Sequence, residues 1–236
     1  MSKKKAIALA LVLVALAALF AYVFHSRVKN GLTPADIAAL RIAAANLHLA
    51  PIPADAGYAS QIALIGEAQK AVLSLAPKND GIPEGSPREP ADLFAQGSGL
   101  CYDRSRSLEK LLRYLGFSTR HVSVYTAPQN GWAYSGLFRG GTPSHAVSEV
   151  LTRKGWLLLD SNAPWMALTA AGDPMSARAM AQDAEKHSIA WQDPGINPIF
   201  RKRFVYIYGL YSRHGRFYPP YNPVPDINWP ELAENF

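Results

Sequence analysis

The chain has 236 residues, 49% of them hydrophobic, with 24 basic residues, 18 acidic residues and one cysteine. This length can bury a substantial core, and the composition excludes collagenous, disordered and disulfide-framework proteins. A single thiol also excludes a structural zinc site built from several cysteines. Residues 1–30 hold five basic residues and no acidic one, which leaves 19 basic against 18 acidic residues in the rest. Because the positive charge is concentrated at the N-terminus, we expect no nucleic-acid-binding face.

The N-terminal segment is predicted to lie in a membrane. An uninterrupted apolar run from Ala6 to Phe24 follows three lysines, and as a helix it would span roughly 28 Å, close to the ~30 Å hydrocarbon core of a bilayer. The small-x-small sequence at 15–17 leaves a cleaved signal peptide as the alternative, but the run exceeds the usual signal core of about 7–15 residues. We therefore predict that residues 1–30 form an uncleaved, single-pass anchor that crosses the inner membrane through residues 6–24. The lysines before the span predict a cytoplasmic N-terminus and a periplasmic body.

Residues 31–76 are predicted to form two helices. Thr33 can cap the first, Pro34 suits its first helical position, and Asp36 lies near the positive end of the helix dipole. Pro51 ends this helix. The second helix is predicted from about Ala56 to Leu75, where an apolar stripe recurs at helical spacing.

Residues 77–165 are predicted to form the core that carries the chemistry. Proline and glycine residues mark 77–99 as a loop with at most one short turn, near 91–94. Leucine spacing then predicts a helix from Cys101 to Leu115. Alternating apolar residues predict strands over 118–126, 144–152 and 156–161, with a long loop over 127–143 between the first two.

Within this core, Cys101, His145 and Asp160 occur at positions where they could act together. A thiol at a helix N-terminus near an imidazolium is favoured as a thiolate nucleophile, and the N–H groups of that first turn can face an oxyanion. If Thr152 pairs with Gly155, His145 and Asp160 are diagonal neighbours on one face of the hairpin. The carboxylate would then orient the imidazole and stabilise its charged form. Taken singly, a buried cysteine, a core histidine and a turn aspartate are each ordinary, whereas the combination favours a catalytic group.

The motifs around these residues resemble the transglutaminase-like superfamily of papain-type thiol enzymes over roughly residues 85–165. The resemblance rests on Gly99-Leu100-Cys101-Tyr102-Asp103-Arg104-Ser105, on Ser144-His145-Ala146-Val147-Ser148-Glu149-Val150 and on Gly155-Trp156-Leu157-Leu158-Leu159-Asp160. The Glu89-Pro90 sequence ahead of the cysteine is similar to the sequence found there in the bacterial cysteine-proteinase branch of the superfamily. Leu100 and Val147 depart from the family pattern, which commonly has Asp before the cysteine in that branch and Trp after the histidine.

The resemblance implies an α+β fold with a papain-like or transglutaminase-like core, in which the nucleophile helix packs on an antiparallel sheet, preceded here by the transmembrane helix. It implies that Cys101 attacks an amide carbonyl, that His145 acts as base and acid, and that Asp160 orients His145. We expect an acyl-enzyme on a protein or peptide substrate, hydrolysis rather than crosslinking, and no metal or cofactor. Gln96 is the candidate oxyanion donor, and Trp132 and Tyr134 are candidates for a substrate loop. The alternative is a catalytically inactive binding module of the same fold in a cell-envelope assembly.

Residues 166–236 are predicted to extend and cover the core. A helix is predicted from Asp173-Pro174 to about Lys186 and a strand over 203–211, followed by an extended segment rich in aromatic residues and proline that packs on the core. The alternative is that aromatic residues such as Tyr211 and Tyr218 hold an envelope protein or a polymer.

Overall fold

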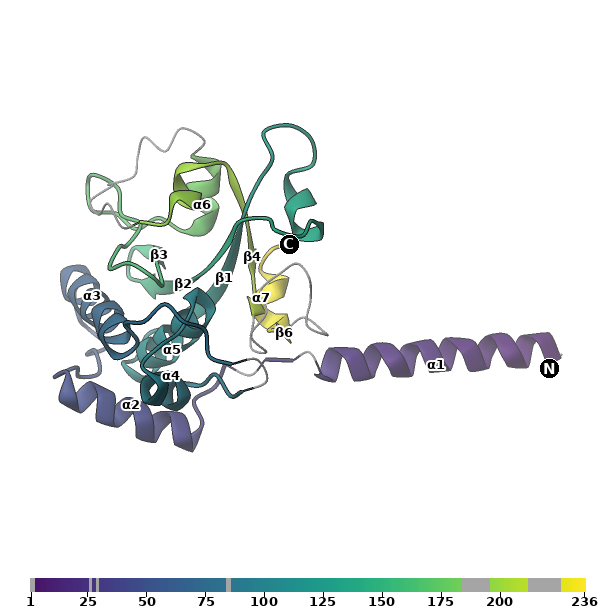
Figure 1. Ribbon diagram of the computed structural model, residues 1–236, viewed down its shortest axis with the longest axis horizontal. Coiled ribbons are helices and arrows are strands. Elements are labelled where there is room, and N and C mark those ends of the chain that lie inside the picture. The colour runs from purple at the N-terminus through teal and green to yellow at the C-terminus, as the bar shows by residue number, and fades with distance from the viewer. Residues whose placement is uncertain (1–2, 26, 29, 84–85, 184–195, 212–225) are drawn as a thin grey trace.

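The computed structural model describes residues 3–25, 27–28, 30–83, 86–183, 196–211 and 226–236, and it shows an α+β domain from which one helix projects (Figure 1). The helices are α1 Lys3–His25, α2 Pro34–Asn46, α3 Tyr58–Leu75, α4 Pro90–Gln96, α5 Cys101–Tyr114, α6 Ala177–Gln182 and α7 Trp229–Ala233, with 3-10 helices η1 Ala133–Phe138 and η2 Pro198–Arg201. The strands are β1 Thr119–Thr126, β2 Ser144–Thr152, β3 Gly155–Leu159, β4 Phe204–Tyr208, β5 Leu210–Tyr211 and β6 Asp226–Ile227.

A four-stranded antiparallel sheet in the order β3-β2-β1-β4 divides the domain into two layers. One face packs against α3 and α5 through a core that includes Leu108, Val150 and Leu157. The other face packs against α6 and η2 through Val147, Leu158 and other apolar side chains. The mixed helix and antiparallel-sheet architecture predicted from the sequence is confirmed, and Thr152 pairs with Gly155 as predicted.

Local sequence signals account for the starts of α2 and α4. The Thr33 hydroxyl accepts a hydrogen bond from Asp36 N–H at 3.1 Å, and Asp36 Oδ2 accepts one from Thr33 N–H at 2.7 Å. This capping box confirms the predicted helix start. The sequence predicted only a short turn near 91–94, but α4 runs over Pro90–Gln96. Asp92 Oδ2 accepts from Glu89 N–H at 3.0 Å, so this carboxylate satisfies a backbone donor that would otherwise oppose helix formation.

Helix α5 carries charged side chains that are almost completely buried. Lys110 forms ion pairs with Asp36 of α2 at 2.7 Å and with Glu89, just before α4, at 2.6 Å. Glu89 also binds Arg106 at 2.7 Å. Because a buried charge without a partner is strongly unfavourable, these pairs hold α2 and α4 against α5 in one arrangement.

The C-terminal part differs from the sequence prediction at its helix. The predicted start at Asp173-Pro174 is wrong, because α6 begins at Ala177 and the Ser176 hydroxyl caps it by accepting from Ala179 N–H at 3.1 Å. Asp173 instead binds Lys154 at 2.6 Å. The predicted end near Lys186, and Tyr218 in the aromatic segment, lie outside the described residues.

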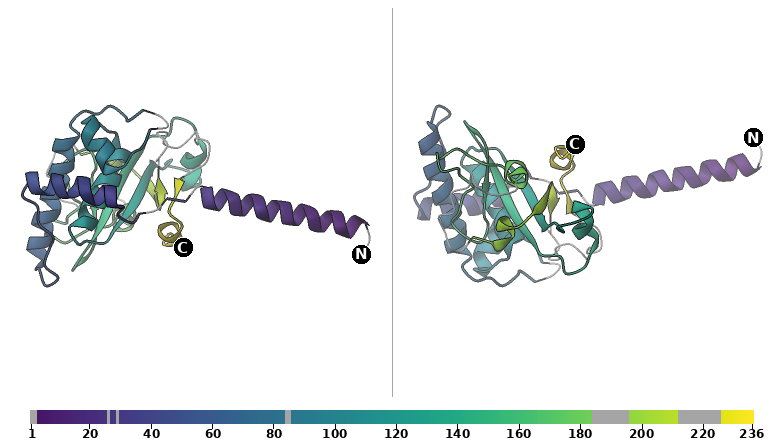
Figure 2. Two further views of the ribbon diagram at one scale, coloured as in Figure 1. Left: turned by 90° about the horizontal axis from the view of Figure 1, so that it is seen from below. Right: turned by 90° about the horizontal axis from the view of Figure 1, so that it is seen from above.

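The apolar helix α1 leaves the domain as a candidate membrane span by length and composition. None of its span, Lys3–Tyr22, is buried within the protein. Beyond α1 the chain rejoins the domain, where Val28 is buried and its N–H donates to Ile227 O at 2.8 Å. All three views show α1 projecting from the end of the domain that carries α7 (Figures 1 and 2).

A second buried cluster fastens the C-terminal elements to α5. Glu109 Oε1 lies 2.7 Å from His121 Nδ1, and Tyr211 Oη donates to Glu109 Oε2 at 3.1 Å. Glu231 Oε2 of α7 lies 3.0 Å from Tyr211 Oη and accepts from His121 N–H at 3.1 Å. Burial, together with the charge of Glu109, raises the pKa of Glu231 to about 7. Glu231 therefore keeps a proton in the folded chain at pH values where the unfolded chain has lost it.

We predict that Glu231→Gln stabilises the protein more at pH 8 than at pH 5. The folded-state pKa of Glu231 exceeds its ordinary value of 4.5, so its contribution to stability falls as pH rises from about 4.5 to about 7. Glutamine, like the protonated acid, avoids that loss. Thermal melting in detergent micelles should show a Tm gain over wild type that is larger at pH 8 by roughly 2–8 °C.

The matched control for this prediction is Glu67→Gln, because Glu67 is exposed and, among the described residues, its ion-pair partner is Lys70 on the same helix. It should show little difference between the two pH values. An equal Tm difference for Glu231→Gln at both pH values would contradict the raised pKa.

Candidate active site

Cys101 is the first residue of α5 and is half-buried. Asp103 fixes this helix start, because its Oδ2 accepts from Leu100 N–H at 2.9 Å and its Oδ1 binds the buried Arg88 guanidinium at 2.6 Å. Residue 99 is a glycine because its backbone lies against the Leu93 side chain, where a Cβ would be 2.4 Å from Leu93 Cδ1. The thiol is thus held at a helix N-terminus whose preceding turn packs directly on α4.

His145 and Asp160 come from the two strands of the β2–β3 hairpin. Both side chains are almost completely buried, and His145 Nε2 lies 2.8 Å from Asp160 Oδ1. Asp160 is the residue after β3, one position beyond the Ser148–Leu159 pair. The structure therefore brings these two predicted site residues into direct contact, as the diagonal register required.

The Asp160 contact determines which imidazole nitrogen is left for the thiol. Cys101 lies close enough to His145 to raise the pKa of its imidazole, and since Nε2 faces Asp160, the nitrogen left for the thiol is Nδ1. Burial disfavours the imidazolium, but the Asp160 carboxylate and then Cys101 outweigh it and raise the pKa of His145 to about 10. The structure places all three predicted residues in one connected group, in the order thiol, imidazole and carboxylate.

Backbone donors hold the Asp160 carboxylate. Oδ1 accepts from Asn162 N–H at 2.8 Å, and Oδ2 accepts from Asn197 N–H at 3.3 Å. Burial alone would raise the pKa of Asp160, but His145 and these two N–H groups lower it below its ordinary value. Asp160 therefore stays ionised and favours the charged form of His145.

Gln69 of α3 holds the backbone of the same turn. Its Nε2 lies 2.6 Å from Asp160 O, 3.0 Å from Ala163 O and 2.8 Å from Trp165 O. The side chain is 1% exposed, so these carbonyl groups have no access to bulk water as a replacement partner. Gln69 thus positions the turn that carries the carboxylate.

Arg104 connects the cysteine helix to this turn. Its Nη1 donates to Asn162 Oδ1 at 2.7 Å, and its Nε donates to Ala76 O at 3.0 Å. Arg104 also lies close enough to interact electrostatically with Cys101, one helical turn earlier. A positive charge therefore lies beside the thiol in addition to the imidazole.

The structure does not bring the remaining predicted site residues to this group. Gln96 is exposed at the end of α4 and has no hydrogen bond to Cys101, His145 or Asp160 in the described part of the chain. Trp132 and Tyr134 lie at η1, in the loop that leads into β2, and their side chains are exposed. Their roles in oxyanion and substrate binding stay predictions.

Sequence reasoning missed Gln69, Arg104 and Asn162. No local pattern marks Gln69, which contacts a carbonyl 91 residues away. Arg104 lies three residues after Cys101, one helical turn along α5, and Asn162 lies two residues after Asp160. Their nearness to predicted site residues was the signal that the sequence offered. Among the described residues, no group of three or more His, Cys, Asp or Glu residues could hold a metal ion.

Comparison with protein families identifies a segment similar to a known superfamily. Residues 69–161 match the model of the transglutaminase-like superfamily. This segment is transglutaminase-like. It contains Cys101, His145 and Asp160, and it confirms the resemblance identified in the sequence motifs. The search of curated proteins finds no match.

Comparison of the whole chain with solved structures gives a further alignment. A "putative protease" from Parabacteroides distasonis aligns with 12% sequence identity and a TM-score of 0.34. The alignment covers 59% of this chain and 30% of that protein, so this chain matches less than a third of its length.

We predict that Gln69→Leu destabilises the protein by about 1–3 kcal/mol, because it removes the side-chain donor from three carbonyl groups and leaves the buried Asp160 O with no other hydrogen bond among the described residues. Thermal melting should show a Tm lower by roughly 3–10 °C. Gln61→Leu is the matched control on the same helix, since its Oε1 accepts one hydrogen bond, from the exposed Arg153 N–H, within the described part of the chain. Equal Tm values for the two variants would show that Gln69 does not support the Asp160 turn.

Proposed function

We propose that this protein is a membrane-anchored thiol enzyme that forms an acyl-enzyme at an amide or peptide bond. The observation that carries the proposal is that half-buried Cys101, at the start of α5, lies in one group with the buried His145–Asp160 pair of the β2–β3 hairpin. An imidazole held between a thiol and a carboxylate is the arrangement needed to generate a thiolate and later to protonate a leaving amine.

The chemistry follows from the positions of the protons. His145 holds the proton of the Cys101 thiol, and the thiolate adds to the substrate carbonyl carbon to give a tetrahedral intermediate. The imidazolium then donates its proton to the departing amine as the C–N bond breaks, leaving a thioester on Cys101. In hydrolysis, His145 takes a proton from water, the hydroxide oxygen bonds to the acyl carbon, and the C–S bond breaks to release the carboxylic acid and restore the thiolate–imidazolium pair.

Backbone donors at the helix start are the first candidates for stabilising the tetrahedral oxyanion. The N–H of Cys101 belongs to the first turn of α5, where intrahelical acceptors are missing, and within the described residues it donates to no protein acceptor. Gln96 remains the proposed side-chain donor and would need to turn toward Cys101 when substrate binds.

Hydrolysis is favoured over crosslinking because Cys101 is only half-buried, so water can reach a thioester at that position. The proposed anchor is α1, and the proposed topology places its N-terminus in the cytoplasm and the domain in the periplasm. A protein or peptide is the proposed substrate. The competing proposal, an inactive binding module, predicts a thiol that His145 does not activate.

We predict that the full chain in detergent micelles reacts with p-nitrophenyl acetate to give an acetyl group on Cys101 and a burst of p-nitrophenolate. Because the chain has one cysteine, intact-mass and peptide analysis assign the adduct directly. His145→Ala should slow the burst by roughly 10²–10⁴-fold, the usual contribution of a general base. Cys101→Ala should abolish it.

Asp55→Asn is the control for this experiment, because Asp55 is exposed in the segment between α2 and α3. It should leave the burst unchanged. A burst of equal rate in wild type and His145→Ala would identify an ordinary thiol and would favour the inactive binding module.

A further inference from the structure

Three aromatic side chains are exposed at η1. Trp132, Tyr134 and Phe138, here called the aromatic patch, are 62%, 38% and 69% exposed. Trp132 stacks on Phe138 with ring centroids 5.5 Å apart and lies 6.4 Å from the Tyr134 ring. A continuous exposed cluster of large aromatic side chains is unusual for a soluble surface and indicates a contact with something apolar.

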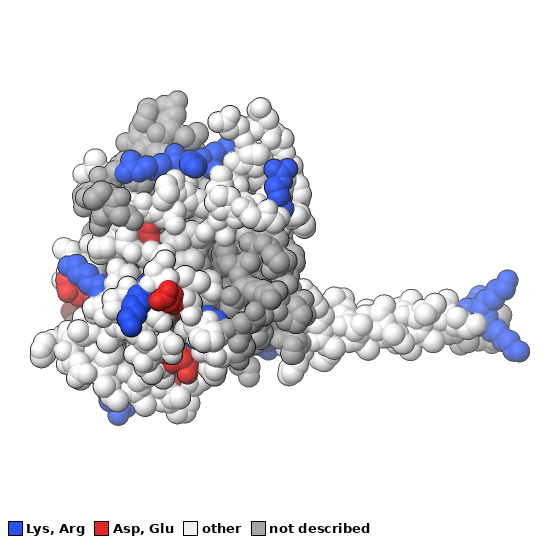
Figure 3. All heavy atoms as spheres, viewed as in Figure 1, with Lys and Arg blue, Asp and Glu red and all other residues white. Residues whose placement is uncertain are grey.

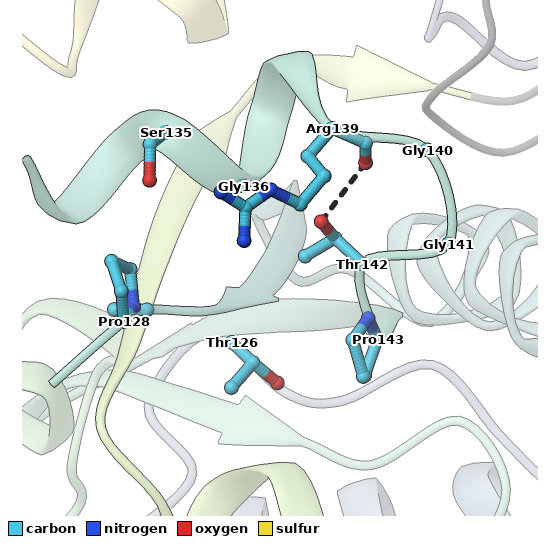
Figure 4. A pocket seen from close by; sticks show the side chains of 10 residues that line it. Thr126, Pro128, Ser135, Gly136, Arg139, Gly140, Gly141, Thr142 and Pro143 are labelled. Carbon is cyan, nitrogen blue, oxygen red and sulfur yellow. Dashed lines mark hydrogen bonds between the residues drawn. The ribbon is translucent and has the colours of Figure 1, made fainter.

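The segment that carries the aromatic patch is fixed to the sheet. A Cβ at Gly136 would lie 3.1 Å from Thr126 O at the end of β1, so η1 packs against the strand without an intervening side chain. The Thr142 hydroxyl donates to Arg139 O at 2.9 Å, and Thr126 N–H donates to Pro143 O at 3.0 Å (Figure 4). The aromatic patch therefore has a definite position on the domain.

That position is beside the base of α1. Leu137 of η1 and Ile227 of β6 belong to the same hydrophobic cluster, and Ile227 accepts the hydrogen bond from Val28 N–H, three residues after α1. Trp132 and Phe138 also line a cavity of about 380 Å³ with Leu232 and other residues that follow β6. All three views show η1 at the end of the domain from which α1 leaves (Figures 1 and 2).

The surroundings of the aromatic patch are basic. Residues 127–143 and 196–211 contain no acidic residue. Four exposed basic residues lie in these two segments: Arg139, Arg201, Lys202 and Arg203. Figure 3 shows Lys and Arg side chains across the upper part of the domain, from the region of α6 to the side from which α1 leaves. This charge is complementary to anionic phospholipid headgroups.

We propose that the aromatic patch docks the domain onto the surface of the bilayer that α1 spans, with Trp132 and Phe138 in the interfacial layer and the basic residues against anionic headgroups. The inference rests on the membrane anchor of the proposed function. Tryptophan and tyrosine favour this layer because their rings are apolar at one end and polar at the other. Since β2 begins directly after this loop, docking would hold His145 at a defined height above the membrane.

Tryptophan quenching by bromine-labelled lipid tests the docking, because α1 contains no tryptophan and the signal comes from the domain alone. The full chain is placed in nanodiscs of bromine-labelled phosphatidylcholine mixed with phosphatidylglycerol, with unlabelled discs as the reference. We expect the wild type to be quenched and Trp132→Phe to lose most of that quenching. Phe138→Ser, which weakens the patch and keeps Trp132, should reduce it.

Trp156→Phe is the matched control, since Trp156 stacks on Arg120 near the β2–β3 turn, at the opposite end of β2 from η1. It should keep the wild-type quenching. Alkaline carbonate extraction of membranes distinguishes a failure of the α1 anchor from a failure of the docking. Release of the chain would overturn both the anchor and the docking, whereas retention without Trp132-dependent quenching would overturn the docking alone.

Discussion

The burial of α5 is the constraint on which the rest of the structure depends. The proposed nucleophile, Cys101, lies at the start of this helix, which packs on the sheet and is covered on nearly every side although it carries Asp103, Arg104, Arg106, Glu109 and Lys110. Each of these charges needs a partner within the protein. The partners come from α2, from the segment before α4, and from the cluster around Tyr211 and Glu231, so pairing them assembles the domain around the helix.

The same constraint explains the arrangement of Cys101, His145 and Asp160, the proposed catalytic group. Asp103 fixes the first turn of α5, and Arg104 reaches from that turn to Asn162, beside Asp160. The hairpin supplies His145 and Asp160 in a register set by the turn at 153–154, and Gln69 holds the backbone beyond β3. The thiol and the carboxylate thus belong to separate layers that are joined both through His145 and through Arg104.

Local patterns predicted most of the fold and the three central residues. The capping residues of α2, the leucine spacing of α5 and the alternation in β1 to β3 each act within a few positions, so the sequence displays them directly. The interactions that the sequence did not reveal are long-range. The Lys110–Asp36 pair and the Gln69 contacts join residues 74 and 91 positions apart. The Asp173 start of α6 was wrong because that side chain pairs with Lys154 across the surface.

The pH dependence of Cys101 alkylation by iodoacetamide, compared between wild type and Asp160→Asn, tests most directly whether the three residues act as one unit. Asp160 raises the pKa of His145 to about 10, so the imidazolium should persist through neutral pH and keep its thiolate partner reactive below pH ~7. Without the carboxylate, burial favours neutral imidazole, and labelling should rise only near the ordinary thiol range of about 8.5. Identical profiles in both proteins, each rising only in that ordinary range, would contradict the account.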